Sequence, residues 1–73
     1  MMDDKIQILD AVTLTQDLPQ KGLRRGQVGT VVEALGEDAF EVEFAGLNGE
    51  AYALLPLHAE QIMVLRYAPA HAV

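Results

Sequence analysis

The sequence predicts a small all-β domain, and three observations carry that prediction. Residues 22–33 are a glycine-rich approach that leads directly into a run of β-branched side chains, which favour strands. Residues 39–45 alternate between apolar and acidic side chains with a period of two, as a strand with one buried face does. Asn48-Gly49 then precedes a further apolar run, and this pair is typical of a tight type I′ hairpin.

Five short strands are predicted along the chain. In the first, over residues 10–14, apolar Val12 and Leu14 flank Thr13. The second covers residues 26–35, with Gly29 marking a bulge or a close backbone approach. The third covers residues 39–45 and buries Phe40 and its alternate neighbours, the fourth covers residues 51–55, and the last covers residues 62–65.

The segments outside the predicted strands are a long loop, a short turn and the two ends of the chain. Residues 15–25 form a long loop because Pro19 has no amide N–H to donate, and Leu18 and Leu23 are spaced to tuck under that loop. Pro56 is expected to end the fourth strand, and residues up to 61 suit a single 3₁₀ turn. Residues 1–9 are compatible with a frayed lead-in, a short helical turn or an early strand, and residues 67–73 read as a tail.

This order of elements predicts a five-stranded SH3-like barrel over residues 10–66. The long first loop would fold over one end, and the single 3₁₀ turn would precede the closing strand. The five strands are too few for an immunoglobulin sandwich.

Composition narrows the possible functions. The chain has 73 residues, enough for one small domain, and a hydrophobic content of 51%, which is too apolar for a disordered protein. Its formal net charge of −6 disfavours binding to nucleic acids and to anionic membranes. It has no cysteine, no signal peptide and no apolar run long enough to span a membrane, so a cytoplasmic protein without a cofactor is expected.

Parts of the sequence resemble two groups of known proteins. Residues 23–32 resemble the glycine-centred loop and strand of SH3-like barrels such as the nitrile hydratase beta subunit and, more weakly, the KOW motif of ribosomal and elongation proteins. A closer resemblance, from about Ile8 to about Leu65, is to a family of small bacterial proteins with a domain of unknown function (number forty-nine twenty-six). It is carried by residues 9–14, 17–19, 22–33, 40–44 and 52–55. It implies a small bacterial domain with no assigned activity, and no catalytic residues can be carried over from the family.

The first candidate site is the basic cluster Lys21, Arg24 and Arg25. Beside three glycines, these side chains suit an anion site, although the ending of a P-loop is missing. The alternatives are a solvated loop whose arginines pair with Asp17 or surface glutamates, and a contact with an acidic protein.

The second candidate site is acidic. Glu33, Glu41 and Glu43 are expected to share an outer sheet face if the second and third strands pair. Alternation places Glu41 and Glu43 in water, so a solvated face or a docking face for a basic partner is favoured over acid–base catalysis.

Metal and nucleophilic sites are not expected. His58 and His71 are the only histidines and have no further ligands at zinc spacing, and the chain has no serine.

The sequence has more large apolar residues than the inner face of a barrel this small can hold, and we call this surplus the apolar excess. The side chains in question are Val31, Leu35, Leu47, Tyr52, Leu54 and Leu57. They are either ordinary surface or a patch that binds another protein or a second copy of the chain.

The sequence therefore favours a non-enzymatic protein-binding module, such as the small partner, inhibitor or antitoxin-like neutraliser of another bacterial protein. The residues expected to touch the partner are Lys21, Arg24, Arg25, Glu41, Glu43 and Tyr52. Two alternatives stay open: a KOW-like nucleic-acid-binding barrel that uses Arg24 and Arg25, and a homo-oligomeric structural or accessory subunit.

Overall fold

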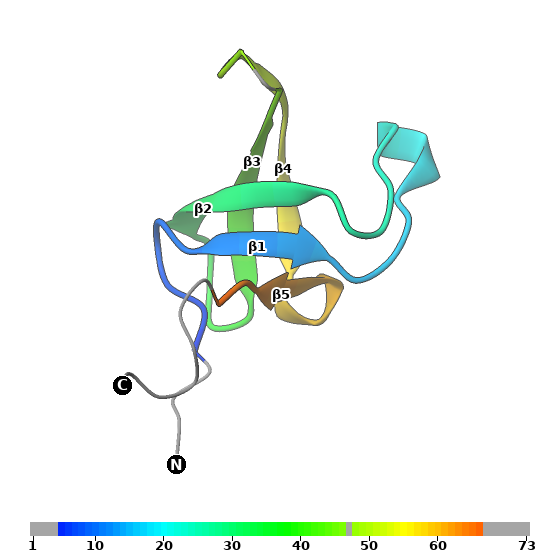
Figure 1. Cartoon of the computed structure of the whole chain (residues 1–73). Helices are drawn as coiled ribbons and strands as arrows, with labels where there is room; N and C mark the ends of the chain where they lie inside the picture. Colours follow the sequence, from blue (N-terminus) through cyan, green and yellow to red (C-terminus); the bar gives the residue numbers. More distant parts are fainter. Residues whose placement is uncertain (1–4, 47, 67–73) are drawn as a thin grey trace, which may run out of the picture.

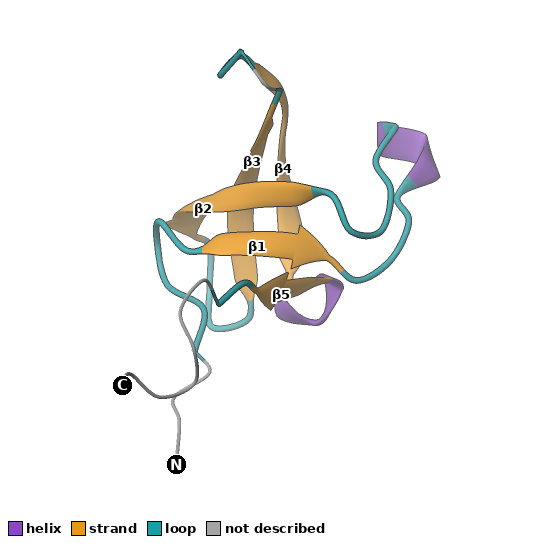
Figure 2. Cartoon of the chain, in the orientation of Figure 1, coloured by secondary structure: helices purple, strands orange, loops and turns teal. Residues whose placement is uncertain are grey.

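The computed structural model describes residues 5–46 and 48–66, which form one five-stranded antiparallel sheet in the order β4-β3-β2-β1-β5. The elements are β1 (Ala11–Leu14), η1 (Pro19–Lys21), β2 (Val28–Ala34), β3 (Ala39–Ala45), β4 (Ala51–His58), η2 (Ala59–Gln61) and β5 (Ile62–Val64). Figure 1 shows β1 and β2 lying across β3 and β4, so the sheet bends over on itself in the manner of an SH3-like barrel. The all-β prediction is confirmed, as is the 3₁₀ turn before the last strand (Figure 2).

The inner face of the bent sheet holds the hydrophobic core. Alternate residues of β3 and β4 point inward, as the period of two in the sequence predicts. The buried side chains come from every strand and from the first loop: Val12, Leu14, Leu23, Val31, Phe40, Val42, Phe44, Leu55, Leu57 and Ile62. Two of the apolar residues expected to be in excess, Val31 and Leu57, therefore belong to the core.

Gly29 is a point of close approach between β2 and β3. A Cβ atom added at this glycine would lie 2.8 Å from the carbonyl oxygen of Glu43 and 2.9 Å from the ring of Phe44. The close approach predicted from the sequence is confirmed. The bulge is elsewhere, because the β2–β3 register shifts between Val31 and Glu33.

The fourth strand is longer than predicted, since it continues through Pro56 to His58. β4 is an edge strand that pairs only with β3, and a proline is tolerated on an edge strand where its nitrogen faces away from the neighbouring strand. The expectation that Pro56 ends the strand is therefore wrong, and the 3₁₀ turn η2 is confined to residues 59–61.

The β3–β4 hairpin does not have the predicted type I′ turn. Gly46 N–H donates to the Glu50 carbonyl at 2.9 Å, which closes a three-residue connection, and Gly49 N–H donates to the Gly46 carbonyl. Gly49 has a φ of 82°, whereas Asn48 is not among the residues with positive φ. The positive φ of Gly49 suits glycine at this end of the hairpin. A separate register shift lies between Phe44 and Ala45: Phe44 pairs with Ala53 and Ala45 with Ala51, so Tyr52 is the extra residue of a bulge on β4.

The long first loop is itself a small hairpin. Leu18 and Leu23 exchange backbone hydrogen bonds of 2.9 and 3.1 Å around η1, which the sequence did not indicate. Leu23 is buried in the core and Leu18 packs against it, so the prediction that both tuck under the loop is confirmed.

The chain enters β1 through a strained turn. Asp10 N–H donates to the Gln7 carbonyl, and Leu9, the residue at the corner, has a φ of 78°. The turn is held against β2, since Leu9 N–H donates to the Val31 carbonyl at 2.7 Å. The side chain of Leu9 is exposed and makes no core contact to offset the strain.

We expect Gly29→Ala to lower the free energy of unfolding by roughly 1–3 kcal/mol, because the new methyl group overlaps backbone that cannot move freely. Urea denaturation measures the loss. Gly36→Ala is the control, because nothing lies within 4 Å of a Cβ atom at Gly36. Equal stability of the two variants would contradict the close approach.

We expect Leu9→Gly to raise the free energy of unfolding by roughly 1 kcal/mol, because glycine adopts a positive φ without steric strain. Ile8→Gly is the matched control: Ile8 is an exposed residue of the same turn without a positive φ, and this variant should lose stability. The idea fails if thermal denaturation shows that both glycine variants are destabilised.

Candidate functional site

The outward-facing residues of β2, β3 and β4 form the outer face of the sheet. Glu43 lies in register between Thr30 on β2 and Leu54 on β4. Two residues along β3, Glu41 lies between Glu33 and Pro56. Each of the two outward glutamates of β3 thus has an apolar neighbour on the edge strand.

The three glutamates share this face, as the sequence predicts. Glu33 is directly opposite Glu41, and Glu43 is two positions further along the same strand. Glu33 is exposed, whereas Glu41 and Glu43 are half-buried rather than fully in water. Like charges placed directly opposite each other across a ladder destabilise it.

Four large apolar side chains form a second feature, which we call the apolar belt: Val28, Tyr52, Leu54 and Met63. Each is between 48% and 56% exposed. Val28 and Met63 lie in register on either side of Thr13, and Tyr52 and Leu54 are both exposed on β4, two residues apart. The belt therefore draws on both edge strands and on β2.

Gln27 connects the belt to the arginine loop. Its side-chain Nε2 donates to the hydroxyl of Tyr52 at 2.9 Å, and its Oε1 accepts from the backbone N–H of Arg24. One amide side chain thus ties Tyr52, on the edge strand β4, to the segment just before β2.

The charged groups of the loop do not form the ion pairs expected for a solvated loop. Asp17 accepts a hydrogen bond of 2.9 Å from the backbone N–H of Arg25, not from a guanidinium group. The side chains of Arg24 and Arg25 are exposed.

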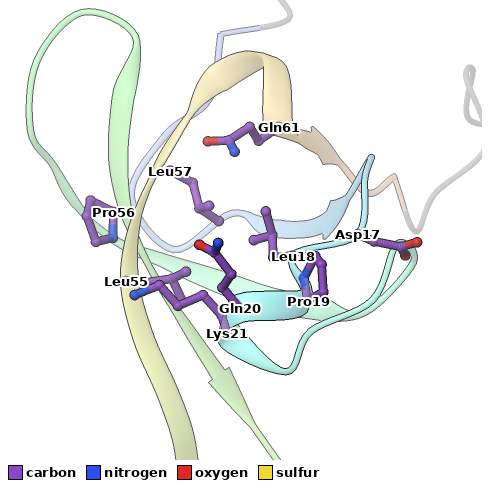
Figure 3. Close-up of a pocket in the computed structure, with 9 residues that line it drawn as sticks. All are labelled: Asp17, Leu18, Pro19, Gln20, Lys21, Leu55, Pro56, Leu57 and Gln61. Carbon is purple, nitrogen blue, oxygen red and sulfur yellow. The ribbon is translucent and has the colours of Figure 1, made fainter.

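Lys21 lies apart from the arginines, on η1, where it borders a groove that we call the seam groove. This groove has a volume of about 350 Å³ and lies between the first loop and the free edge of β4 (Figure 3). Leu18, Pro19, Leu55 and Leu57 supply its apolar lining, and Asp17, Gln20, Lys21, Pro56 and Gln61 complete it.

The structure therefore brings together only part of the predicted site. Arg24 and Tyr52 are joined through Gln27, and Glu43 is beside Leu54, whereas Lys21 borders the seam groove. Sequence reasoning missed Gln27, and it named Leu54 only as part of the apolar excess, not among the residues expected to touch the partner. The alternation along β4, once extended through Pro56, places Leu54 on the outer face.

Histidine contributes little to this face. The backbone N–H of His58 donates to the Oε1 of Gln61 at 2.8 Å, and His71 lies outside the described residues. Within residues 5–46 and 48–66, no three His, Asp or Glu side chains are grouped closely enough to hold a metal ion. No helix in that part of the chain is long and apolar enough to cross a membrane.

Comparison with known families identifies the chain only at the level of a family. Residues 8–64 match the family described as Domain of unknown function (DUF4926). The chain belongs to this family. No curated protein and no solved structure gives a significant match.

We expect Glu33→Lys to raise the free energy of unfolding by roughly 0.5–1 kcal/mol at low salt, because it replaces a like-charge pair with Glu41 by an attractive one. Urea denaturation measures the gain, which should shrink at high salt as the charges are screened. Glu37→Lys is the control, because Glu37 is exposed in the β2–β3 connection and this substitution changes the net charge by the same amount as Glu33→Lys. If Glu37→Lys raises the free energy of unfolding equally, the effect comes from net charge and not from the pair of Glu33 and Glu41.

Proposed function

We propose that this protein is a non-enzymatic protein-binding module that recognises its partner through the outer face of the sheet. The observation that carries the proposal is the apolar belt, whose four large side chains are each about half exposed. Single exposed apolar residues are ordinary on a protein surface, but grouped ones favour an interaction site. The belt holds two such groups: Val28 with Met63, on either side of Thr13, and Tyr52 with Leu54 on β4.

The surroundings of the belt support binding to a protein with basic groups. Glu43 is the register neighbour of Leu54, and Glu41 and Glu33 continue the acidic row beyond it. A protein interface typically combines an apolar centre with a polar rim, and opposite charges on the partner speed association and select against wrong partners. The net charge of −6 acts in the same direction.

Tyr52 is the residue best placed to act as an anchor. Its hydroxyl is already held by Gln27, so its ring is oriented before a partner arrives. Tyrosine side chains lose little conformational entropy on binding and are frequent energetic centres of interfaces.

Affinity capture with matched variants tests the proposal. The tagged chain is expressed in its source organism, cross-linked and purified, and recovered proteins are identified by mass spectrometry. Leu54→Lys, within the belt, should lose the captured partner. Leu35→Lys should retain it, because Leu35 is an equally large, 48% exposed leucine that lies outside the belt.

Two results would overturn the proposal. One is recovery of the tagged chain alone, as a monomer by sedimentation, at both low and high salt. The other is capture of the same partner in equal amounts by wild type and Leu54→Lys.

A further inference from the structure

The turn that leads into β1 holds a leucine at a position that suits glycine. We call residues 7–10 the Leu9 turn. Asp10 N–H donates to the Gln7 carbonyl at 3.0 Å, and Leu9 is the third of the four residues. Leu9 has a φ of 78°, whereas Ile8 is not among the residues with positive φ. This pattern is that of a type II turn, in which the third residue is normally glycine.

The same leucine is the first residue of a β-bulge. Leu9 N–H donates to the Val31 carbonyl at 2.7 Å, and Val31 N–H donates to the Asp10 carbonyl at 2.9 Å. Two residues before β1 thus oppose one residue of β2. In a bulge whose first residue has a left-handed conformation, that residue is usually glycine. Two local motifs therefore favour glycine at residue 9, where the chain has leucine.

The side chain of Leu9 is directed away from its own molecule. It is 77% exposed, the largest exposed fraction of any large hydrophobic side chain that the structure describes, and Ile8 beside it is 54% exposed. Backbone strain of this kind is concentrated at functional sites. The hydrogen bonds to Val31 hold the turn in one conformation, so Leu9 is a pre-organised apolar anchor that loses little entropy when another molecule buries it.

The seam groove is a site of matching chemistry. Leu18, Leu55 and Leu57 supply apolar walls, and Figure 3 shows Lys21 extending from η1 at the border of the groove. The side chain of Lys21 is exposed. The groove therefore combines an apolar interior with a cation at its border.

The charges of the two surfaces are complementary. Asp10 follows Leu9, and Gln7 N–H holds its carboxylate in the turn through a hydrogen bond of 2.8 Å. The first loop, in contrast, is the basic part of an acidic chain. Residues 15–25 carry a net charge of +2 within a chain of net charge −6, because they contain Lys21, Arg24, Arg25 and Asp17. An acidic turn with an apolar tip thus matches an apolar groove beside a basic loop.

The strand β1 separates the two surfaces. The Leu9 turn precedes β1 and the first loop follows it, so the turn and the loop lie at opposite ends of this strand (Figure 1). The turn therefore cannot enter the groove of its own molecule. A contact between unlike surfaces of two copies leaves one turn and one groove unoccupied, so further copies can add.

We propose that the Leu9 turn of one copy docks in the seam groove of a second copy, and that the chain assembles head to tail in this way. Leu9 and Ile8 enter the apolar part of the groove, and Asp10 faces Lys21 of the other copy. This inference does not rest on the protein-binding function proposed above, because it uses neither the outer face of the sheet nor the apolar belt.

Leu9→Gly tests the anchor without weakening the fold, since glycine suits both the turn and the bulge. We expect its association constant to fall roughly tenfold or more while its thermal stability rises, so unfolding cannot explain the loss. Leu35→Gly is the matched control. It removes a leucine that is 48% exposed and lies outside both surfaces, and it should assemble as the wild type does.

Lys21→Glu tests the groove. We expect association to weaken roughly tenfold or more, because this substitution places a carboxylate opposite Asp10. Arg25→Glu is the control, since it makes the same change of charge in the same loop but Arg25 does not line the groove. Circular dichroism checks that each variant is folded.

Sedimentation over a range of concentrations measures the assembly. The mass of the wild type should rise with concentration beyond that of a dimer, and more strongly at low salt than at high salt. An equal mixture of Leu9→Gly and Lys21→Glu should form a dimer that does not grow. Such a dimer joins the intact turn of one variant to the intact groove of the other.

Four results would overturn head-to-tail assembly. The wild type remains a monomer or stops at a dimer, Leu9→Gly assembles as readily as the wild type, Arg25→Glu weakens assembly as much as Lys21→Glu, or the mixture of variants stays monomeric. Leu54→Lys, in the apolar belt, should assemble normally, and a monomeric Leu54→Lys would place the contact in the belt instead. A partner captured through the belt is compatible with each of the four results, so the two proposals fail separately.

Discussion

The close approach of β3 to β2 at Gly29 is the constraint on which the rest of the structure depends. Because this position has no side chain, the ring of Phe44 occupies the space in front of it, and the backbone of Glu43 comes within contact distance. The two strands therefore pack tightly where the sheet bends, and the buried side chains of β1 and β5 meet those of β3 and β4 in one core. A side chain at residue 29 would hold the two halves of the sheet apart and open that core.

The same packing determines which side chains lie on the outer face of the sheet. Since the inner positions of β3 and β4 are filled by aromatic and aliphatic side chains, the period of two assigns Glu41, Glu43 and Leu54 to the outer face. The alternation that builds the core also juxtaposes acidic and apolar groups on the exterior. The Glu33–Glu41 pair places like charges directly opposite each other, which lowers the stability of the ladder.

Much of the fold could be predicted from the sequence because the strongest signals are local. The alternation at Phe40, Val42 and Phe44 depends on side chains within one strand, and so did the prediction of a close approach at Gly29. The predictions that were wrong depended on pairing. Pro56 ends a central strand but not an edge strand, and the turn type at Asn48-Gly49 depends on how the flanking strands register.

The candidate site, like the fold, could be predicted only where the signal was local. Glu41 and Glu43 followed from alternation, but Gln27 gave no local signal, because its hydrogen bond to Tyr52 joins residues 25 positions apart. The hairpin around η1 was similarly hidden, since it depends on Leu18 and Leu23 facing each other across a loop that periodicity alone describes as irregular.

The edge of β4 shows how a small domain limits an exposed strand without abolishing it. An open edge invites indefinite pairing with other chains, and proteins restrict this with prolines and by occupying backbone groups. Pro56 and the Gln61 side chain remove the donors at two successive outward positions, and the bulge near Ala45 interrupts the ladder at the other end. Tyr52 is the extra residue of that bulge, so Leu54 is the outward-facing position that lies between the two interruptions. An edge open for that length is too short to propagate a sheet, so the proline, the Gln61 side chain and the bulge together protect the exposed strand from edge-to-edge pairing.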